Sequence, residues 1–291
     1  MSTYAPMQQF AAAFRGQSGG AIMGGVICAM AAFAVLGVVI SSVGLAPGTD
    51  PVSITLILCS YALPAVALLF WAGRKQGIEP GALFGPSPQV RMDAAIAARR
   101  VLASLGAIFA LTILAIGLSG AIEPPDAAEA GRMRDAAPWL AALPFAAVAV
   151  LLQSGSEEVL FRGYLMPALR ARSANPWVWL AGPAILFGMA HVPYAETWQD
   201  GAFLFIVTGL LGLALGDLTA RTGSIGAAVG LHWAWNVWQF ILFAEEGSPM
   251  SGYALFLQPT APRADFGPLT LLAVALTILI PWLAIRLGLR R

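Results

Sequence analysis

Eight apolar runs, most of them about as long as a membrane is thick, decide what this chain can fold into. A helix needs about 20 residues to cross about 30 Å of hydrocarbon. The fourth run is too long for one perpendicular crossing, so it is expected to tilt or to extend beyond the bilayer, and the fifth is short. The sequence therefore predicts an all-α polytopic membrane protein of about eight transmembrane helices, at residues 21–43, 52–72, 100–121, 139–171, 176–192, 202–220, 224–244 and 268–288.

Composition favours a membrane-embedded chain over a soluble one. Hydrophobic residues make up 58% of the 291 positions and charged residues only 11%, too few to cover the exterior of a soluble fold. The net charge of +1 provides no basic field for a nucleic-acid partner. Since no linker or internal repeat divides the sequence, residues 1–291 are predicted to form a single transmembrane domain. The first apolar run carries no cleavage pattern and is expected to be a retained span.

Basic residues are distributed unevenly between the loops. With the N-terminus in the cytoplasm, twelve of the 16 Lys and Arg residues fall on cytoplasmic segments, and only Arg132, Arg134 and Arg263 fall on the opposite loops. The positive-inside bias therefore predicts that both termini are cytoplasmic. Because all but one of the basic residues are Arg, as in GC-rich bacterial genomes, the expected location is the cell membrane of a bacterium, its inner membrane.

A small set of polar side chains interrupts the apolar runs. Ionisable groups inside a bilayer are costly, face the protein interior and are functional candidates by default. His191 and His232, the only two histidines of the chain, both lie in such runs. The interrupting residues are Gln153, Ser154, Ser156, Glu157, Glu158 and Arg162 in the fourth run, His191 in the fifth, Asp217 in the sixth, and His232 and Asn236 in the seventh.

Helical spacing sorts the fourth run by direction. Glu158 and Arg162 are four residues apart, so they share one face and are predicted to form a structural ion pair that holds Glu157 in place. Glu157 is rotated by about 100° from its neighbour and points elsewhere. Asp217 and Arg221 have the same spacing near a membrane surface, and a structural pair is expected there as well.

The other polar residues repeat this spacing on two further helices. Phe187 and His191 are four apart, as are His232 and Asn236, which could aim two polar groups at one point between helices. At about 1.5 Å per residue, Glu157, His191, His232 and Asn236 reach similar depths in the membrane. A packing hydrogen bond is the alternative for any one of them, but four such residues at one depth indicate a shared buried site. The small residues of Gly212–Gly216 and Gly226–Gly230 are predicted to let helices approach closely.

This set of side chains supports hydrolysis by activated water. A carboxylate and an imidazole that share a water can act as a general base, and a second imidazole with an amide can hold an oxyanion. An H-E-x-x-H metalloprotease motif and a presenilin-like G-x-G-D site are both lacking. Glu157, His191 and His232 have the ligand types of a zinc site, although their spacing does not indicate one. No cofactor is therefore expected, with a divalent metal left open.

Three motifs in order resemble those of a known family. Residues 157–162 (EEVLFR) match E-E-x-x-x-R, residues 187–191 (FGMAH) match F-x-x-x-H, and residues 232–236 (HWAWN) match H-x-x-x-N. Together they resemble the CPBP family, which includes Rce1-type CAAX prenyl proteases and bacterial bacteriocin-processing or abortive-infection proteins. The resemblance covers about residues 135–245, the motif-bearing core. It implies an eight-helix Rce1-like fold.

The resemblance also implies roles for the motif residues. Glu157 and His191 would activate the water, while His232 and Asn236 would form the oxyanion hole. Glu158, Arg162 and Phe187 would support the site.

The expected function is that of a glutamate-dependent intramembrane endopeptidase. Its expected partners are a membrane-associated or lipid-modified protein or peptide substrate and the membrane lipid itself. The alternative is a non-catalytic membrane immunity or interaction protein on the same fold. A proton-coupled transporter is a third and weaker alternative, because no inverted repeat is evident. No residue pattern identifies the substrate, its side of entry or an oligomeric state.

Overall fold

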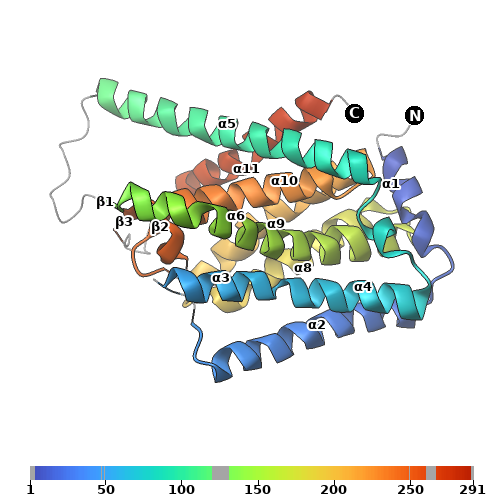
Figure 1. Ribbon diagram of the computed structural model, residues 1–291. Helices are drawn as coiled ribbons and strands as arrows, with labels where there is room; N and C mark the ends of the chain where they lie inside the picture. Colours follow the sequence, from blue (N-terminus) through green and yellow to red (C-terminus); the bar gives the residue numbers. More distant parts are fainter. Residues whose placement is uncertain are drawn as a thin grey trace.

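The computed structural model describes residues 4–46, 48, 50–119, 131–248, 250–259 and 267–289, and they form a helical bundle (Figure 1). The α-helices are α1 Ala5–Phe10, α2 Gly19–Ser42, α3 Pro51–Ser60, α4 Ala62–Gln76, α5 Ser87–Ser119, α6 Ala136–Glu158, α7 Met166–Arg170, α8 Gly182–His191, α9 Trp198–Thr222, α10 Gly226–Asn236 and α11 Pro268–Leu289. Stretches of π-helix span Val159–Leu165, Trp177–Ala181 and Val237–Leu242, and short 3₁₀ turns span Ala11–Phe14, Pro80–Leu83, Val192–Tyr194 and Ser251–Tyr253.

Within the described ranges, six helical segments are long and apolar enough to cross a membrane. They are Gly19–Ser42, Pro51–Gln76, Pro80–Leu118, Ala136–Arg170, Trp198–Thr222 and Pro268–Leu289. The predicted all-α, multi-pass membrane architecture is therefore confirmed. The predicted fifth and seventh spans are also helical, but each is divided between a π-helical stretch and an α-helix of 10 or 11 residues. The α5 helix begins at Ser87, thirteen residues before the predicted span at 100–121.

Proline explains the breaks within two predicted spans. Pro64 has no N–H, and its ring clashes with the carbonyl of residue 60, so the helix is interrupted at Tyr61 between α3 and α4. Pro183 acts likewise on the carbonyl of residue 179, which lies in the π-helical turn before α8. The break at Tyr61 lies beside the polar site.

Glycines let the central helices pack closely, as predicted. A Cβ at Gly226 would lie 2.3 Å from the backbone oxygen of Val90, and one at Gly230 would lie 2.3 Å from that of Ala94. A Cβ at Gly212 would lie 3.0 Å from Ala184 Cα. Backbone contact of this kind fixes α10 against α5 and α9 against α8, which sets the direction in which the polar residues of these helices point.

A small sheet that the sequence did not predict lies at one end of the bundle. The strands β1 Arg132–Met133, β3 Phe256–Gln258 and β2 Phe243–Glu245 are ordered β1-β3-β2, with β1 antiparallel and β2 parallel to β3. A cavity of about 420 Å³ beside it is lined by residues such as Arg134, Trp139 and Tyr253. Arg263, which the sequence assigns to a loop opposite the cytoplasmic segments, lies outside the described residues.

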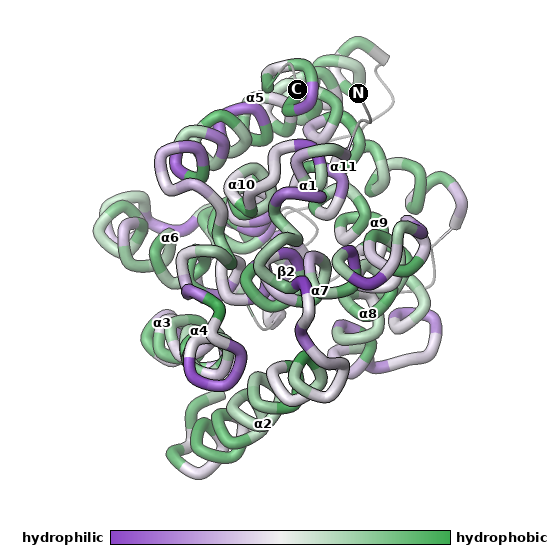
Figure 2. Tube along the Cα trace, turned by 90° about the vertical axis from the view of Figure 1, so that its right-hand side faces the viewer, coloured by the Kyte–Doolittle hydropathy of each residue, from purple (hydrophilic) through white to green (hydrophobic). Residues whose placement is uncertain are grey.

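The other end of the bundle collects the basic helix ends. The final residues of α4, α7, α9 and α11 lie there together with α1 (Figure 1). Viewed from this end, hydrophilic residues gather near the end of α4 and beside α1, whereas α2 and α3 are mainly hydrophobic (Figure 2). This arrangement agrees with a bundle whose first and last described helices end on one side of a membrane. Which side faces the cytoplasm remains a prediction.

Candidate active site

The predicted ion pair lies at the junction of α6 and the π-helical stretch Val159–Leu165. Arg162 Nη1 donates to Glu158 Oε1 at 3.0 Å, and the exposed fractions of their side chains are 1% and 0%. Arg162 Nη2 also donates to the Gly212 carbonyl on α9 at 3.1 Å. The guanidinium carbon lies 4.6 Å from the centre of the Phe187 ring. The pair is thus confirmed, and it joins α6 to α8 and α9.

The partner that this ion pair orients is His232 rather than Glu157. His232 Nδ1 lies 2.7 Å from Glu158 Oε1, and a carboxylate can only accept, so Nδ1 carries a hydrogen. The other ring nitrogen, Nε2, therefore faces away from the pair and lies 3.7 Å from Glu157 Oε2. The expected hold of this pair on Glu157 is therefore indirect and runs through His232, because Glu158 turns toward α10 while Arg162 turns toward α8 and α9.

Glu157 is instead held by a residue on its own face of α6. Gln153 Nε2 donates to Glu157 Oε1 at 2.6 Å. Glu157 Oε2 is buried and has no hydrogen-bond partner within the described part of the chain. The Glu157 side chain is 18% exposed, against 3% for His232 and none for Glu158. One carboxylate oxygen is therefore fixed and the other is available.

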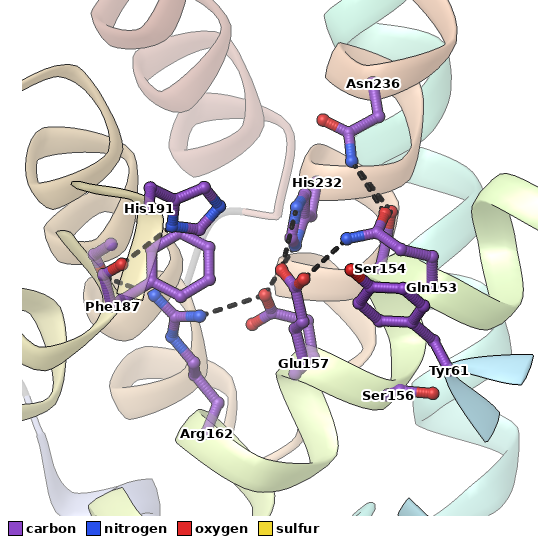
Figure 3. A network of polar contacts seen from close by, with 12 residues as sticks. Tyr61, Gln153, Ser154, Ser156, Glu157, Arg162, Phe187, His191, His232 and Asn236 are labelled. Carbon is purple, nitrogen blue, oxygen red and sulfur yellow. Dashed lines mark hydrogen bonds and ion pairs between the residues drawn. The ribbon is translucent and has the colours of Figure 1, made fainter. Parts of the chain in front are cut away.

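Asn236 reaches the site through the same glutamine. Its Nδ2 donates to Gln153 Oε1 at 3.1 Å and to Ser154 Oγ at 3.2 Å (Figure 3). An amide nitrogen carries two hydrogens, so both are in use. Asn236 thus positions Gln153, and through it Glu157. To hold an oxyanion it would exchange one of these bonds.

Gln153 is the residue whose role sequence reasoning missed. It was noted among the polar residues of the fourth run, but no role followed from its position. The available signal was its place four residues before Glu157, which puts the two on one helix face.

His191 lies across the site from these contacts. Its Nδ1 is 2.8 Å from the Phe187 carbonyl, which can only accept, so Nδ1 carries a hydrogen. Nε2, which is an acceptor in the neutral ring, turns toward the carboxylates (Figure 3). The Phe187 ring is 4.7 Å from the His191 ring and 5.8 Å from the His232 ring, measured between centres. No hydrogen bond links His191 to Glu157 among the described residues. Phe187 is the wall that places both imidazoles around one space.

The structure brings all seven predicted site residues into one cluster on α6, the π-helical stretch that follows it, α8 and α10. No group of three or more His, Cys, Asp or Glu side chains in the described ranges is placed to hold a metal ion. Asp93, which is fully buried on α5, was not predicted as buried because the apolar run begins after it. By contrast, the predicted Asp217–Arg221 pair is confirmed at 2.9 Å, near the end of α9.

The region that holds these residues is similar in sequence to a known protein family. Residues 138–238 match the family described as type II CAAX prenyl endopeptidase Rce1-like, and this range holds every predicted site residue. The uncharacterized protein YyaK of Bacillus subtilis (strain 168) is 30% identical over 114 residues, which are 39% of this chain and 38% of that protein. The matched segment therefore spans well under half the length of this relative. No solved structure matches the chain.

Proposed function

Because residues 138–238 of this multi-pass membrane protein form an Rce1-like domain, we propose that it is a glutamate-dependent endopeptidase. Its substrate would be a membrane-associated or lipid-modified protein or peptide, cleaved within the membrane. The observation that carries the proposal is the pair of atoms Glu157 Oε2 and His232 Nε2. They lie 3.7 Å apart, and the carboxylate oxygen has no hydrogen-bond partner among the described residues. Glu158 Oε2 also lacks a hydrogen-bond partner there, but the Glu158 side chain is fully buried, whereas that of Glu157 is 18% exposed, so Glu157 is the carboxylate that a water can reach.

The charges around this pair support acid–base chemistry in a medium of low dielectric. When His232 carries both ring protons, the two positive charges of His232 and Arg162 balance the two negative charges of Glu157 and Glu158. A cluster of zero net charge avoids the cost of an isolated ion in the membrane. Arg162 pairs with Glu158, and the same Glu158 oxygen orients His232 by accepting from its Nδ1.

The proposed reaction moves one proton at each step. Glu157 Oε2 accepts a proton from a water as the water oxygen bonds to the carbonyl carbon of the scissile peptide. The carbonyl oxygen becomes an oxyanion, and the Nε2–H of protonated His232 donates to it. Glu157 then returns its proton to the leaving amine as the C–N bond breaks. One water and one peptide bond are consumed, and a carboxyl and an amine product form. No covalent enzyme intermediate is involved.

His191 and Asn236 complete the proposed site. His191 Nε2 can accept a hydrogen bond from the attacking water, which fixes the direction of its oxygen. Asn236 holds Gln153, and Gln153 holds the other oxygen of Glu157. The free lone pairs of Oε2 are thereby directed at the water.

The test is cleavage of a defined peptide in liposomes. An internally quenched fluorogenic peptide that ends in an S-farnesylated CAAX sequence would be compared with its unfarnesylated form. We expect Glu157→Gln to reduce cleavage at least about 100-fold, because the general base is lost. Glu79→Gln is the control and should match wild type, because Glu79 is exposed and lies just after the end of α4, outside the site.

Cellular peptide termini extend this test to substrates of other sequence. New termini in the membrane proteome that need wild-type protein, and that vanish with Glu157→Gln at equal abundance, would support hydrolysis. Termini and phenotype that are identical in both strains would instead favour the non-catalytic interaction protein.

A further inference from the structure

Two tyrosines that no motif includes lie at the edge of the site. Tyr61 occupies the break between α3 and α4, and Tyr194 ends the 3₁₀ turn Val192–Tyr194 after α8. Their hydroxyl oxygens are 3.3 Å apart, although the residues are 133 positions apart in the sequence. The contact is therefore a product of tertiary packing, and it joins the two helical segments on either side of Glu157.

Each tyrosine adjoins one of the proposed catalytic groups. The Tyr61 hydroxyl points toward the Glu157 carboxylate from the side opposite His191 (Figure 3). The Tyr194 ring centre lies 6.2 Å from that of His191. The chain His191, Tyr194, Tyr61 thus runs around the least buried edge of the site.

This edge faces the apolar exterior of the bundle. Tyr194 is 63% exposed, whereas His232 is 2% exposed. Two apolar residues close to the tyrosines in the sequence, Leu63 of α4 and Met189 of α8, are each 55% exposed. Exposed apolar side chains on membrane-spanning helices face lipid. A peptide that arrives from the lipid would meet the two hydroxyls before it meets Glu157.

The two tyrosines differ in how firmly they are held. The Tyr61 ring packs edge-on against Phe33 of α2, with centres 5.3 Å apart. Tyr194 lies on a turn of three residues, none of which is buried. The 3.3 Å between the oxygens exceeds the 2.5–3.0 Å that is usual for O–H···O bonds, so the contact is weak. Tyr194 is the partner that can be displaced, and Tyr61 is the one that stays.

We propose that Tyr61 is a substrate-binding residue, whose hydroxyl bonds to Tyr194 in the free protein and to a main-chain carbonyl of the peptide once it enters. The Tyr61–Tyr194 contact then marks the entrance from the lipid side. The hydroxyl holds the peptide in line with Glu157 Oε2. This inference rests on the proposed function, since it names the residue that receives the peptide at the same site.

The opposite effects of two matched substitutions test this role. Tyr61→Phe removes only the hydroxyl, and we expect it to raise the KM for the farnesylated CAAX peptide by about threefold to tenfold, the value of one hydrogen bond. Tyr194→Phe removes the competing partner, and we expect the KM to fall by about twofold to threefold. Tyr253→Phe loses a hydroxyl contact outside the site, 2.6 Å to Thr55 beside the small sheet, and should change neither KM nor kcat.

A purely structural pair would give a different pattern. If the contact only braced the helices, both substitutions would act in the same direction and lower thermal stability together, and this result would overturn the inference. An unchanged KM in Tyr61→Phe, with cleavage still dependent on Glu157, would also overturn it while leaving the proposed function intact.

Binding in an inactive background separates the two proposals. The affinity of the same peptide, labelled with a fluorophore, would be measured by anisotropy for Glu157→Gln alone and combined with Tyr61→Phe or Tyr194→Phe. Weaker binding with Tyr61→Phe and tighter binding with Tyr194→Phe would support the inference even if wild type did not cleave the peptide. In that case the proposed hydrolysis would fail and the binding site would stand. Equal binding by all three proteins would refute the inference.

Discussion

Two acid–arginine pairs with the same spacing lie on neighbouring helices, and they have different surroundings. The Asp217 carboxylate, at the end of α9, accepts from Tyr4, from Arg221 and from Trp282 at 2.9–3.0 Å. In the Glu158–Arg162 pair, deep in the bundle, Glu158 accepts from Arg162 and His232 through Oε1 alone. The Oε2 atoms of Glu158 and of the adjacent Glu157 have no hydrogen-bond partner in the described chain.

The two sites have the same residue spacing but differ in how many of their carboxylate oxygens accept hydrogen bonds. Both oxygens of Asp217 accept hydrogen bonds, and the residues that donate them come from α9, α11 and the start of the chain. The Asp217 carboxylate therefore has a structural role, in which it links α9 to α11 and to the start of the chain. At Glu157 the fold holds one oxygen and leaves the other available, which is how a base is prepared for a substrate.

Breaking each pair at its arginine should show the largest contrast. Arg162→Met leaves the Glu158 charge buried without its partner, so we expect a loss of about 3–5 kcal/mol in unfolding free energy. Arg221→Met should lose about 1 kcal/mol, because the Asp217 side chain is 11% exposed and keeps its other donors. Chemical unfolding of the purified protein in detergent measures both. Equal losses would mean that the two pairs have the same structural role.

Exchanging each acid for its amide should separate catalysis from bracing. An amide at position 158 can present its NH₂ group to His232 Nδ1 and reverse the tautomer, so Glu158→Gln should lower kcat/KM about 100-fold. Asp217→Asn should leave kcat/KM within about twofold, although it lowers the melting temperature. The readout is cleavage of the farnesylated peptide by equal amounts of folded protein. A comparable drop in kcat/KM for Asp217→Asn would contradict the distinction.

Removing the residue that fixes Glu157 should have a smaller effect. Gln153→Leu keeps the volume of the side chain but removes the 2.6 Å bond to Glu157 Oε1, and we expect kcat/KM to fall about tenfold. Gln89→Leu is the matched control, because Gln89 donates at a similar 2.6 Å to the Thr222 carbonyl outside the site. If both variants lost the same activity, a general loss of stability would explain the result.

The smallest expected effect is a pH dependence of stability that arises from the contact between Tyr4 and Asp217. Burial, followed by the hydrogen bond to Asp217, raises the pKa of Tyr4 above its usual 10.0. The folded state therefore gains stability from neutral Tyr4 that is fully present below pH 10 and is lost as the pH rises through the higher folded-state pKa. Tyr4→Phe should flatten the alkaline decline of the melting temperature. An unchanged alkaline decline would show that Tyr4 does not contribute to it.

Local geometry explains which features of the fold and site could be read from the sequence. Apolar length placed the helical segments, and the spacing of four residues identified both Glu158–Arg162 and Asp217–Arg221, because such pairs lie within one helix. The order of three motifs located the family-matched region, residues 138–238. These features depend on neighbours in the chain, so no knowledge of packing was needed.

Packing between helices decided the rest. His232 bonds to Glu158 across 74 positions and Asn236 bonds to Gln153 across 83, so each contact depends on how two helices are rotated and how closely they approach. The Tyr61–Tyr194 contact further requires the helix break before Pro64 and the turn after His191. The sequence by itself determined that this protein is a membrane bundle with a buried Glu, His and Asn set. Only the tertiary structure decided which carboxylate orients the histidine and which one stays available, because side-chain direction is set by backbone contacts that residue spacing does not encode.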